Sequence, residues 1–172
     1  SALDFQDVER LSIAIGGQVH GYDPAMHFGR QEITLYDKFT QFALLAAAEA
    51  VAEAGLELSE EASANAGVVL GTAGGGLQTQ DENYRSVYEE GKNRVHPFVV
   101  PRLMNNAAAS HVSMRHNLQG PSYTVATACA SSNHAMGQAF NLIRSGVSGV
   151  MLTGGSDSML GFGGINAWVG LR

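Results

Sequence analysis

Cys129 is the only cysteine in the 172-residue chain, and it stands where a strand is expected to turn into a helix. Residues 121–125 are rich in β-formers and follow Gly120, which predicts a short strand. Residues 130–145 carry apolar side chains at three- and four-residue spacing, which predicts a helix. A thiol at a helix N-terminus lies near unpaired N–H groups and the positive end of the dipole, and both favour the thiolate. We therefore interpret Cys129 as a nucleophile.

The alternative is that Cys129 has no chemistry. A lone cysteine among alanine and valine commonly serves as a small buried apolar side chain, and spacing alone leaves both interpretations open. His134 follows Cys129 by five residues and would lie about 140° around the helix from it, so we interpret this histidine as structural. The sequence therefore offers no local Cys–His pair of the kind a thiol hydrolase needs.

The other histidines do not predict a metal site. His111 and His116 fall in one predicted helix, but they are five residues apart, which is not metal-ligand spacing. The remaining three fall in expected loops, where solvated side chains are usual: His20, His27 and His96. No metal and no metal ligands are therefore expected.

The residues around Cys129 resemble the nucleophile segment of a known family. The segment reads Thr-Ala-Cys-Ala-Ser-Ser over 127–132, and Gly154-Gly155 follows the predicted helix. It resembles the β-ketoacyl-acyl-carrier-protein synthases, the elongating ketosynthases of the thiolase superfamily. Further segments that match this family in order and spacing are 66–72, 74–77, 97–101, Asn105 and 120–122. The resemblance therefore covers essentially the whole chain.

The resemblance implies a reaction for Cys129. This cysteine would accept the acyl group, and its own backbone N–H would form half of an oxyanion hole. A malonyl unit on an acyl carrier protein would then lose carbon dioxide and attack the acyl-thioester. Phosphopantetheine would arrive on the carrier protein, so no bound cofactor is expected. The family also uses two histidines and a lysine from the second half of its fold.

The resemblance also implies an acyl pocket and a homodimer. The family position that matches Gly74 lies at the pocket floor and often carries isoleucine or a larger side chain, so a deep pocket is expected here. Phe98 and Val99 would line the neighbouring wall across the dimer contact. The strand 121–125 would pair with its two-fold mate to join the subunits. The alternative is that Gly74 only permits a tight turn and another side chain fills the space.

The expected partner, an acyl carrier protein, is acidic and is docked on basic residues in the family. The loop before the first long helix offers Arg30 and Lys38, and it is poorer in charge than the family often shows. Lys92 and Arg94 form a second candidate patch. The chain itself has 10 basic and 16 acidic side chains, which argues against nucleic acid as a partner.

Alternating strand and helix signals predict an α/β fold. Expected strands cover 11–15, 66–71, 121–125 and 148–153, and expected helices cover 34–54, 77–90, 105–118 and 130–145. The glycine clusters at 71–76 and 161–164 are interpreted as turns; no Lys-Ser/Thr follows the first, as a phosphate loop would require. The resemblance specifies a thiolase-like layered fold, of which residues 1–172 would form most of the N-terminal half, without the family's opening strand or its C-terminal half.

The amino-acid composition limits the size of the core, the redox compartment and the membrane topology that we expect for this chain. The chain is 45% apolar, which suffices for one domain with a core. A single cysteine excludes a disulfide framework, so a reduced cytoplasmic setting is expected. No apolar run reaches about 18 residues, and the first residues lack the features of a signal peptide, so neither a membrane span nor a leader is expected.

Three other functions stay open beside that of a condensing enzyme in fatty-acid or polyketide-type synthesis. The first is a non-condensing superfamily partner that only sets chain length, against which Cys129 counts, because such partners typically lack the nucleophile. The second is a free-standing acyl-binding module made of this half alone. The third is a thiol hydrolase.

Overall fold

The computed structural model describes residues 1–5 and 7–171, and within them the elements alternate as expected. The strands are β1 (Ala66–Gly71), β2 (Ser122–Val125) and β3 (Val150–Gly155). The helices before β1 are α1 (Arg30–Leu35), α2 (Lys38–Glu53) and α3 (Glu60–Ala64). Those after it are α4 (Leu77–Tyr84), α5 (Val99–Leu103), α6 (Ala107–Arg115), α7 (Ser131–Arg144) and α8 (Phe162–Val169). Short turns of 3₁₀-helix are η1 (Val8–Arg10) and η2 (Pro24–Met26), and the π-helical turn η3 (Arg85–Glu89) extends α4.

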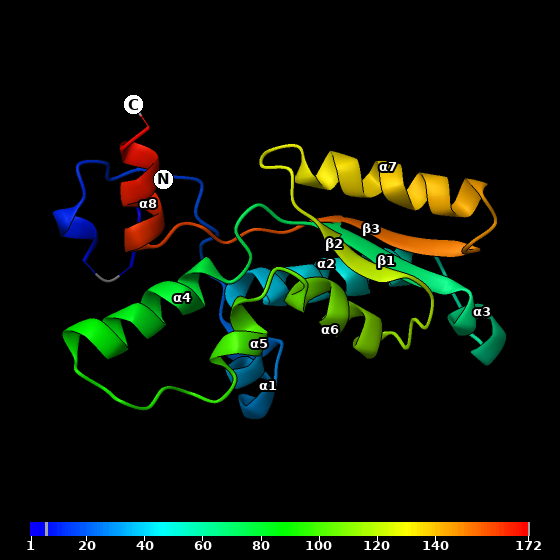
Figure 1. Cartoon of the computed structure of the whole chain (residues 1–172), viewed down its shortest axis with the longest axis horizontal. Coiled ribbons are helices and arrows are strands. Elements are labelled where there is room, and N and C mark those ends of the chain that lie inside the picture. The colour runs from blue at the N-terminus through cyan, green and yellow to red at the C-terminus, as the bar shows by residue number, and fades with distance from the viewer. Residues whose placement is uncertain (6, 172) are drawn as a thin grey trace.

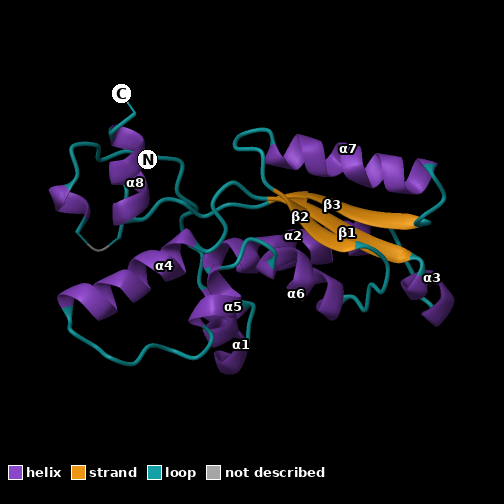
Figure 2. Cartoon of the chain, in the orientation of Figure 1, coloured by secondary structure: helices purple, strands orange, loops and turns teal. Residues whose placement is uncertain are grey.

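The strands form one parallel sheet in the order β2-β1-β3 (Figure 2). The register pairs Gly71 with Val125 on one side and with Gly155 on the other. All three strands therefore end at the same edge, and the loops that follow them leave the sheet together. Ligand sites of open α/β sheets lie at this carboxyl edge.

Helices cover both faces of the sheet. In Figure 1, α7 lies over one face, and α2 and α6 lie over the other. The core on the α2 side contains Phe39, Val68 and Val112, each fully buried. Burial of one such side chain contributes about 1.5–3 kcal/mol, so this face carries much of the fold's stability.

Helix α7 packs on the sheet with its small residues. Ala135 and Ala139 are buried against the strands, which lets the helix approach the sheet closely. A second apolar stripe, about 90° around the helix from these alanines, is exposed and consists of Met136, Phe140 and Ile143. An apolar surface that is wider than the face on the sheet is typical of a helix in an inner layer of a larger structure.

The region around α8 packs beside α4, away from the sheet (Figure 1). The Arg10 guanidinium lies 4.6 Å from the centre of the Phe162 ring, and the Arg85 side chain bonds the Asp7 carboxylate at 2.6 Å. These contacts join the N-terminal segment to α8 and to the end of α4. Among the described residues no helix is long and apolar enough to cross a membrane.

Three expectations about elements were wrong. Residues 11–15 do not form a strand: only Ile15 makes an isolated bridge, to Ala2, and Ile15 is 72% exposed, so the alternating pattern has no core to face. The expected helix 34–54 is two helices, because buried Asp37 ends one and caps the next through the Phe39 N–H. The glycine-rich segment 161–164 is not a turn but opens α8, with Gly161 as its N-cap.

Candidate active site at Cys129

Cys129 lies on the tight turn between β2 and α7, as predicted, and it is exposed. The residue before it, Ala128, has a φ of 49°, in the left-handed region. An alanine in this region costs about 1–2 kcal/mol. Strain of this kind is often kept at functional sites, where the surrounding structure holds it in place. The turn therefore presents the thiol at the beginning of the helix.

Ser131 holds the turn together. Its buried hydroxyl accepts a hydrogen bond from the Thr127 N–H at 2.9 Å and donates one to the Ala128 carbonyl at 2.6 Å. The backbone N–H groups of Ala130 and Ser131 donate back to Thr127 and Ala128, each at 3.1 Å. One side chain thus spans the strained residue on both sides and fixes the position of Cys129.

Two glycines let the start of α7 sit against the ends of the strands. A Cβ on Gly71 would collide with the backbone of Ser131 and Ser132. A Cβ on Gly155 would lie 2.8 Å from the Ser132 Cβ. Because both contacts leave no room for a side chain, the carboxyl edge of β1 and β3 supports the cysteine turn directly.

The Asp157 carboxylate organises the glycine turn that follows β1. Its Oδ1 accepts hydrogen bonds from the Thr72 hydroxyl at 2.8 Å and from the Gly74 N–H at 3.0 Å, and the Ala73 N–H donates to both oxygens at 3.1 Å. An internal carboxylate therefore occupies the N–H groups that a phosphate would use in a phosphate loop. This agrees with the interpretation of residues 71–76 as a turn.

A cavity of about 360 Å³ opens beside Cys129. It is lined by the last residues of β1 and β3, the loops after the three strands, the start of α7 and one residue of α8: Gly71, Ala73, Ala128, Cys129, Ser131, Ser132, Gly155, Ser156, Asp157, Met159 and Trp168. The walls combine small residues with the large side chains of Met159 and Trp168. Cys129 therefore lies beside an open space at the carboxyl edge of the sheet.

The structure places the three predicted pocket residues apart from this cavity. A Cβ on Gly74 would lie 2.6 Å from the Leu77 Cδ1 and 3.3 Å from the Met159 Cε, so these two side chains already occupy the space beside it. Phe98 is 43% exposed and faces another cavity, while Val99 is buried beside a third. Within one chain the three residues are not brought together with Cys129, and their role across a dimer contact stays a prediction.

No histidine in the described part of the chain lines the Cys129 cavity. His134 is exposed on α7, and His111 packs its ring against Tyr36 with 4.7 Å between centroids. Burial, and secondly the positive charge of Arg115, lowers the pKa of His111, and the same causes lower the pKa of His116. The described residues therefore do not form the Cys–His pair of a thiol hydrolase.

The candidate basic patch is partly neutralised. The Lys92 ammonium pairs with the Glu90 carboxylate, whose pKa it lowers, and Arg102 lies 3.9 Å from the Glu82 carboxylate. Lys92, Arg94 and Arg102 share one polar cavity of about 230 Å³. Of the two residues in this candidate patch, Lys92 is therefore paired with a carboxylate, and Glu82 lines the same cavity as the three basic side chains.

Sequence reasoning missed the supporting residues. Asp157, Met159 and Ser131 received no role, although Asp157 and Met159 follow the Gly-Gly end of a predicted strand. A polar residue just beyond the carboxyl end of a parallel strand is itself a signal of site participation. Trp168 was missed because residues 161–164 were interpreted as a turn.

The fold is of the α/β class, and Cys129 lies exposed on a strained strand-to-helix turn at the carboxyl edge of its parallel sheet. The sequence profile described as "Beta-ketoacyl synthase, N-terminal domain" matches residues 13–171. The chain belongs to this family, which confirms the resemblance.

Curated relatives agree with this assignment. Nodulation protein E of Rhizobium leguminosarum bv. trifolii is 40% identical over 149 residues, which are 87% of this chain and 37% of that protein. A 3-oxoacyl-[acyl-carrier-protein] synthase 2 of Staphylococcus aureus is 33% identical over 152 residues, which are 88% of this chain and 38% of that protein. The chain thus spans well under half the length of the relatives it matches.

Solved structures confirm the thiolase-like fold. A β-ketoacyl synthase from Burkholderia phymatum STM815 matches with a TM-score of 0.75 and 25% identity, over 88% of this chain and 37% of that one. A type II PKS ketosynthase, solved with its acyl-carrier protein and bound to a hexaketide, matches with a TM-score of 0.79 and 22% identity, over 86% of this chain and 42% of that one. The fold of this chain is therefore that of a ketosynthase over the residues that match the family's N-terminal domain.

Proposed function

We propose that this chain carries the nucleophile of a β-ketoacyl-[acyl-carrier-protein] synthase, with Cys129 as the residue that accepts the acyl group. The observation that supports this most is the position of the thiol, exposed on a strained turn at the start of α7 and beside a cavity. Membership of the β-ketoacyl synthase family agrees with it.

In the first half-reaction the Cys129 thiolate attacks the carbonyl carbon of an acyl-phosphopantetheine thioester. The bond from that carbon to the phosphopantetheine sulfur breaks, the pantetheine thiolate leaves and takes up a proton, and the acyl group stays on Cys129. The Cys129 N–H would donate to the carbonyl oxygen as negative charge develops there. Phosphopantetheine is here part of the substrate, carried by the acyl carrier protein.

In the second half-reaction a malonyl-thioester loses carbon dioxide, and the carbanion left behind attacks the acyl carbonyl on Cys129. A carbon–carbon bond forms, the Cys129 sulfur leaves as thiolate, and a β-ketoacyl-thioester results. The groups that promote decarboxylation, two histidines and a lysine in the family, would come from outside these 172 residues. Residues 1–172 would then supply the nucleophile and most of the N-terminal half of the catalytic domain.

The proposed partners are an acyl carrier protein and a second subunit. The acidic carrier would dock near Lys92 and Arg94 in the loop before α5, where Arg102 of α5 adds a third basic side chain to the same cavity. The second subunit would pair along β2, because this edge strand has β1 on only one side in the sheet of the described residues, and an unpaired edge is a template for another strand. Light scattering that shows a stable monomer of the native protein at micromolar concentration would contradict this dimer.

A non-condensing partner subunit is the second candidate. Two of the similar structures are ketosynthases solved with a chain length factor, so the alternative occupant of the β2 edge is an unlike partner. Cys129 favours the condensing role for this chain. A reduced, cytoplasmic setting follows from the same proposal, because the thiol must stay free to react.

The test is transfer of an acyl group in the native protein. Incubation with hexanoyl-carrier protein should add one hexanoyl group to the peptide that contains Cys129, and malonyl-carrier protein should then give a β-ketoacyl product. Cys129→Ser should abolish both. Acylation without condensation would favour the acyl-binding module, absence of any adduct would favour the non-condensing partner, and hydrolysis of the thioester without a covalent adduct would favour a hydrolase.

A further inference from the structure

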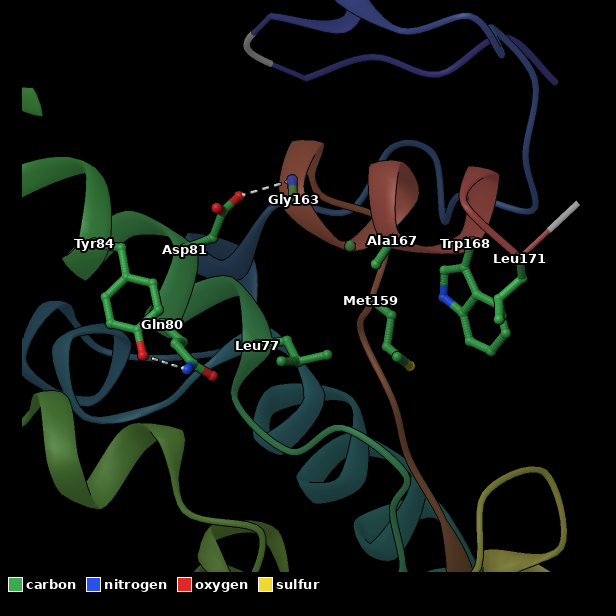
Figure 3. Close-up of a pocket in the computed structure, with 10 residues that line it drawn as sticks. Leu77, Gln80, Asp81, Tyr84, Met159, Gly163, Ala167, Trp168 and Leu171 are labelled. Atoms are coloured by element: carbon green, nitrogen blue, oxygen red, sulfur yellow. Dashed lines mark hydrogen bonds between the residues drawn. The ribbon is translucent and has the colours of Figure 1, made fainter. Parts of the chain in front are cut away.

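Helix α4 lines a cavity on each of two opposite faces. Figure 3 shows the face toward α8, where Leu77 and Tyr84 lie among mainly apolar neighbours. Glu82 and Asn83 lie about half a turn around the helix and line a polar cavity of about 230 Å³, formed by α4, α5 and the segment between them. The polar cavity shares no lining residue with the cavity at Cys129, so its chemistry is separate from acyl transfer.

The polar cavity, called here the Arg102 cavity, has more cationic than anionic side chains. Lys92, Arg94 and Arg102 line it. The one carboxylate among its lining residues is that of Glu82, whose side chain is 59% exposed and can turn to water. Lys92 is paired with Glu90, but Arg94 forms no ion pair within the described part of the chain, and the Arg102 side chain is only 20% exposed. The cavity therefore favours an anion, with the two arginines as its main partners.

One donor and one acceptor in the lining residues have no partner. Arg102 Nε and Asn83 Oδ1 are both buried and form no hydrogen bond within the described part of the chain. Buried polar atoms are nearly always paired, so both atoms would gain from an occupant of the cavity. Because they are shielded from solvent, they reach such an occupant only when the two side chains turn toward it. An occupant that satisfies both must accept one hydrogen bond and donate another.

His96 adds a further donor. Its Nδ1 accepts a hydrogen bond from the Phe98 N–H at 3.3 Å, so the proton of the neutral ring lies on Nε2. His96 lines the Arg102 cavity from the segment between α4 and α5. Donors in the wall therefore outnumber acceptors, as they do in sites for oxyanions.

The volume limits the occupant to a small group. About 230 Å³ is the share of roughly seven water molecules in the liquid. Guanidinium groups bind phosphate oxygens through paired N–H donors, which suits a tetrahedral oxyanion. Inorganic phosphate keeps at least one hydroxyl at neutral pH and can donate it to an acceptor such as Asn83 Oδ1, whereas sulfate keeps none. The acceptor in the wall therefore favours phosphate over sulfate.

We propose that the Arg102 cavity binds inorganic phosphate, held by Arg94 and Arg102 and distinguished from sulfate by a hydrogen bond to Asn83 Oδ1. Lys92 and Arg94 are also the residues proposed to meet the acidic carrier protein, so bound phosphate competes with the carrier for them. Phosphate binding is measured without the carrier, so its failure and the failure of carrier docking are distinguishable.

The test is calorimetric titration of the native protein with three anions at one ionic strength: inorganic phosphate, sulfate and methyl phosphate. A phosphate monoester has a second pKa of about 6, so methyl phosphate has lost most of its hydroxyl at about pH 7.5. Inorganic phosphate should bind at least fivefold more tightly than either of the others at this pH. Equal binding of all three would overturn the inference and indicate general attraction of anions, and absence of phosphate binding would overturn it as well.

Substitution of the arginines tests which side chains hold the anion. Arg94→Gln and Arg102→Gln should each weaken phosphate binding at least tenfold. Arg94 is exposed, so its variant remains informative even if loss of Arg102 disturbs the fold. Arg144→Gln is the matched control: Arg144 is exposed on α7 and does not line the cavity, and its variant should leave the affinity unchanged. A similar loss in all three variants would overturn the inference.

Two further variants separate the acceptor from the carboxylate. Asn83→Leu should lower the phosphate affinity to that of sulfate and change sulfate binding less than twofold. Glu82→Gln should strengthen the binding of both anions at least twofold, because it removes the negative charge from the cavity, and a gain in affinity cannot come from lost structure. A preference for phosphate that persists in Asn83→Leu, or weaker phosphate binding in Glu82→Gln, would overturn the inference.

Discussion

The Thr72 hydroxyl donates a hydrogen bond of 2.8 Å to the Asp157 carboxylate, and through this pair the loop after β3 holds the glycine turn after β1. The two residues are 85 positions apart in the sequence and meet because parallel strands end at one edge. The same carboxylate accepts the N–H groups of Ala73 and Gly74. Asp157 is therefore a positioning residue for the glycine turn, of which Ala73 lines the Cys129 cavity.

Asp157→Asn should loosen this turn without unfolding the protein. The amide nitrogen would replace one acceptor, so at least one N–H of residues 73–74 would lose its partner, at a cost of about 1 kcal/mol. Hydrogen exchange at the Ala73 and Gly74 amides should then quicken roughly fivefold, while β1 stays protected. Asp4→Asn, at an exposed position, is the control and should leave these rates unchanged. Unaltered exchange in Asp157→Asn would show that the carboxylate does not hold the turn.

Ser131→Ala should weaken the cysteine turn itself. The buried hydroxyl serves both the Thr127 N–H and the Ala128 carbonyl, and its loss leaves both without that partner. The free energy of unfolding should fall by about 1–3 kcal/mol, measured by urea denaturation. Alkylation of Cys129 by iodoacetamide should also slow. Ser145→Ala, at the exposed end of α7, should leave both values nearly unchanged, and a similar loss in both variants would argue against a special role for Ser131.

Two glycine-to-alanine changes should have opposite effects. Gly71→Ala would drive a methyl group into the backbone of Ser131 and Ser132, which cannot move without shifting α7, so a loss of at least about 2 kcal/mol is expected. Gly137→Ala adds a methyl group on α7 where no atom lies within 4 Å, and it should stabilise the helix by about 0.5–1 kcal/mol. Thermal unfolding of both variants checks the sign of each effect. Destabilisation by Gly137→Ala would mean that another surface packs there.

Stability should fall as the solution becomes acidic, partly through His111. Burial, followed by the charge of Arg115, lowers the pKa of His111 in the folded state below its ordinary value of 6.5. The unfolded chain therefore binds a proton more readily, so His111 supports folding fully above pH 6.5 and less as the pH falls through its folded pKa. His111→Phe should flatten the stability profile below pH 6.5, measured by urea denaturation at several pH values. An unchanged slope of the free energy of unfolding against pH would show that His111 does not contribute to this pH dependence.

The sequence alone predicted those elements whose structure is decided by a local pattern of residues. Residues 66–71 form β1 with the predicted bounds, and the strand-to-helix junction at Cys129 lies where the β-rich segment meets the helical repeat. Strand β1 was predicted well because it is buried at nearly every residue, so its run of apolar side chains reflects the core it faces. The family motif then added the chemistry that spacing alone left open.

The sequence alone did not predict those elements and site residues whose structure is decided by contacts between distant parts of the chain. Residues 161–164 carry three glycines, yet α8 forms there because Asp81 caps its first turn from another helix, a contact without a local signal. Residues 11–15 alternate like a strand but have no second strand to pair with beyond one bridge. Likewise Asp157 becomes part of the site only because the parallel register brings its loop to Thr72.

The most direct test of the central claim is the mass of the native protein after incubation with an acyl-carrier protein. We predict a single acyl adduct, located by peptide mapping on the segment that contains Cys129, absent from Cys129→Ser and removed by hydroxylamine as a thioester would be. An adduct that persists in Cys129→Ser, or none at all while the carrier remains acylated, would contradict the assignment of Cys129 as the acyl-accepting nucleophile.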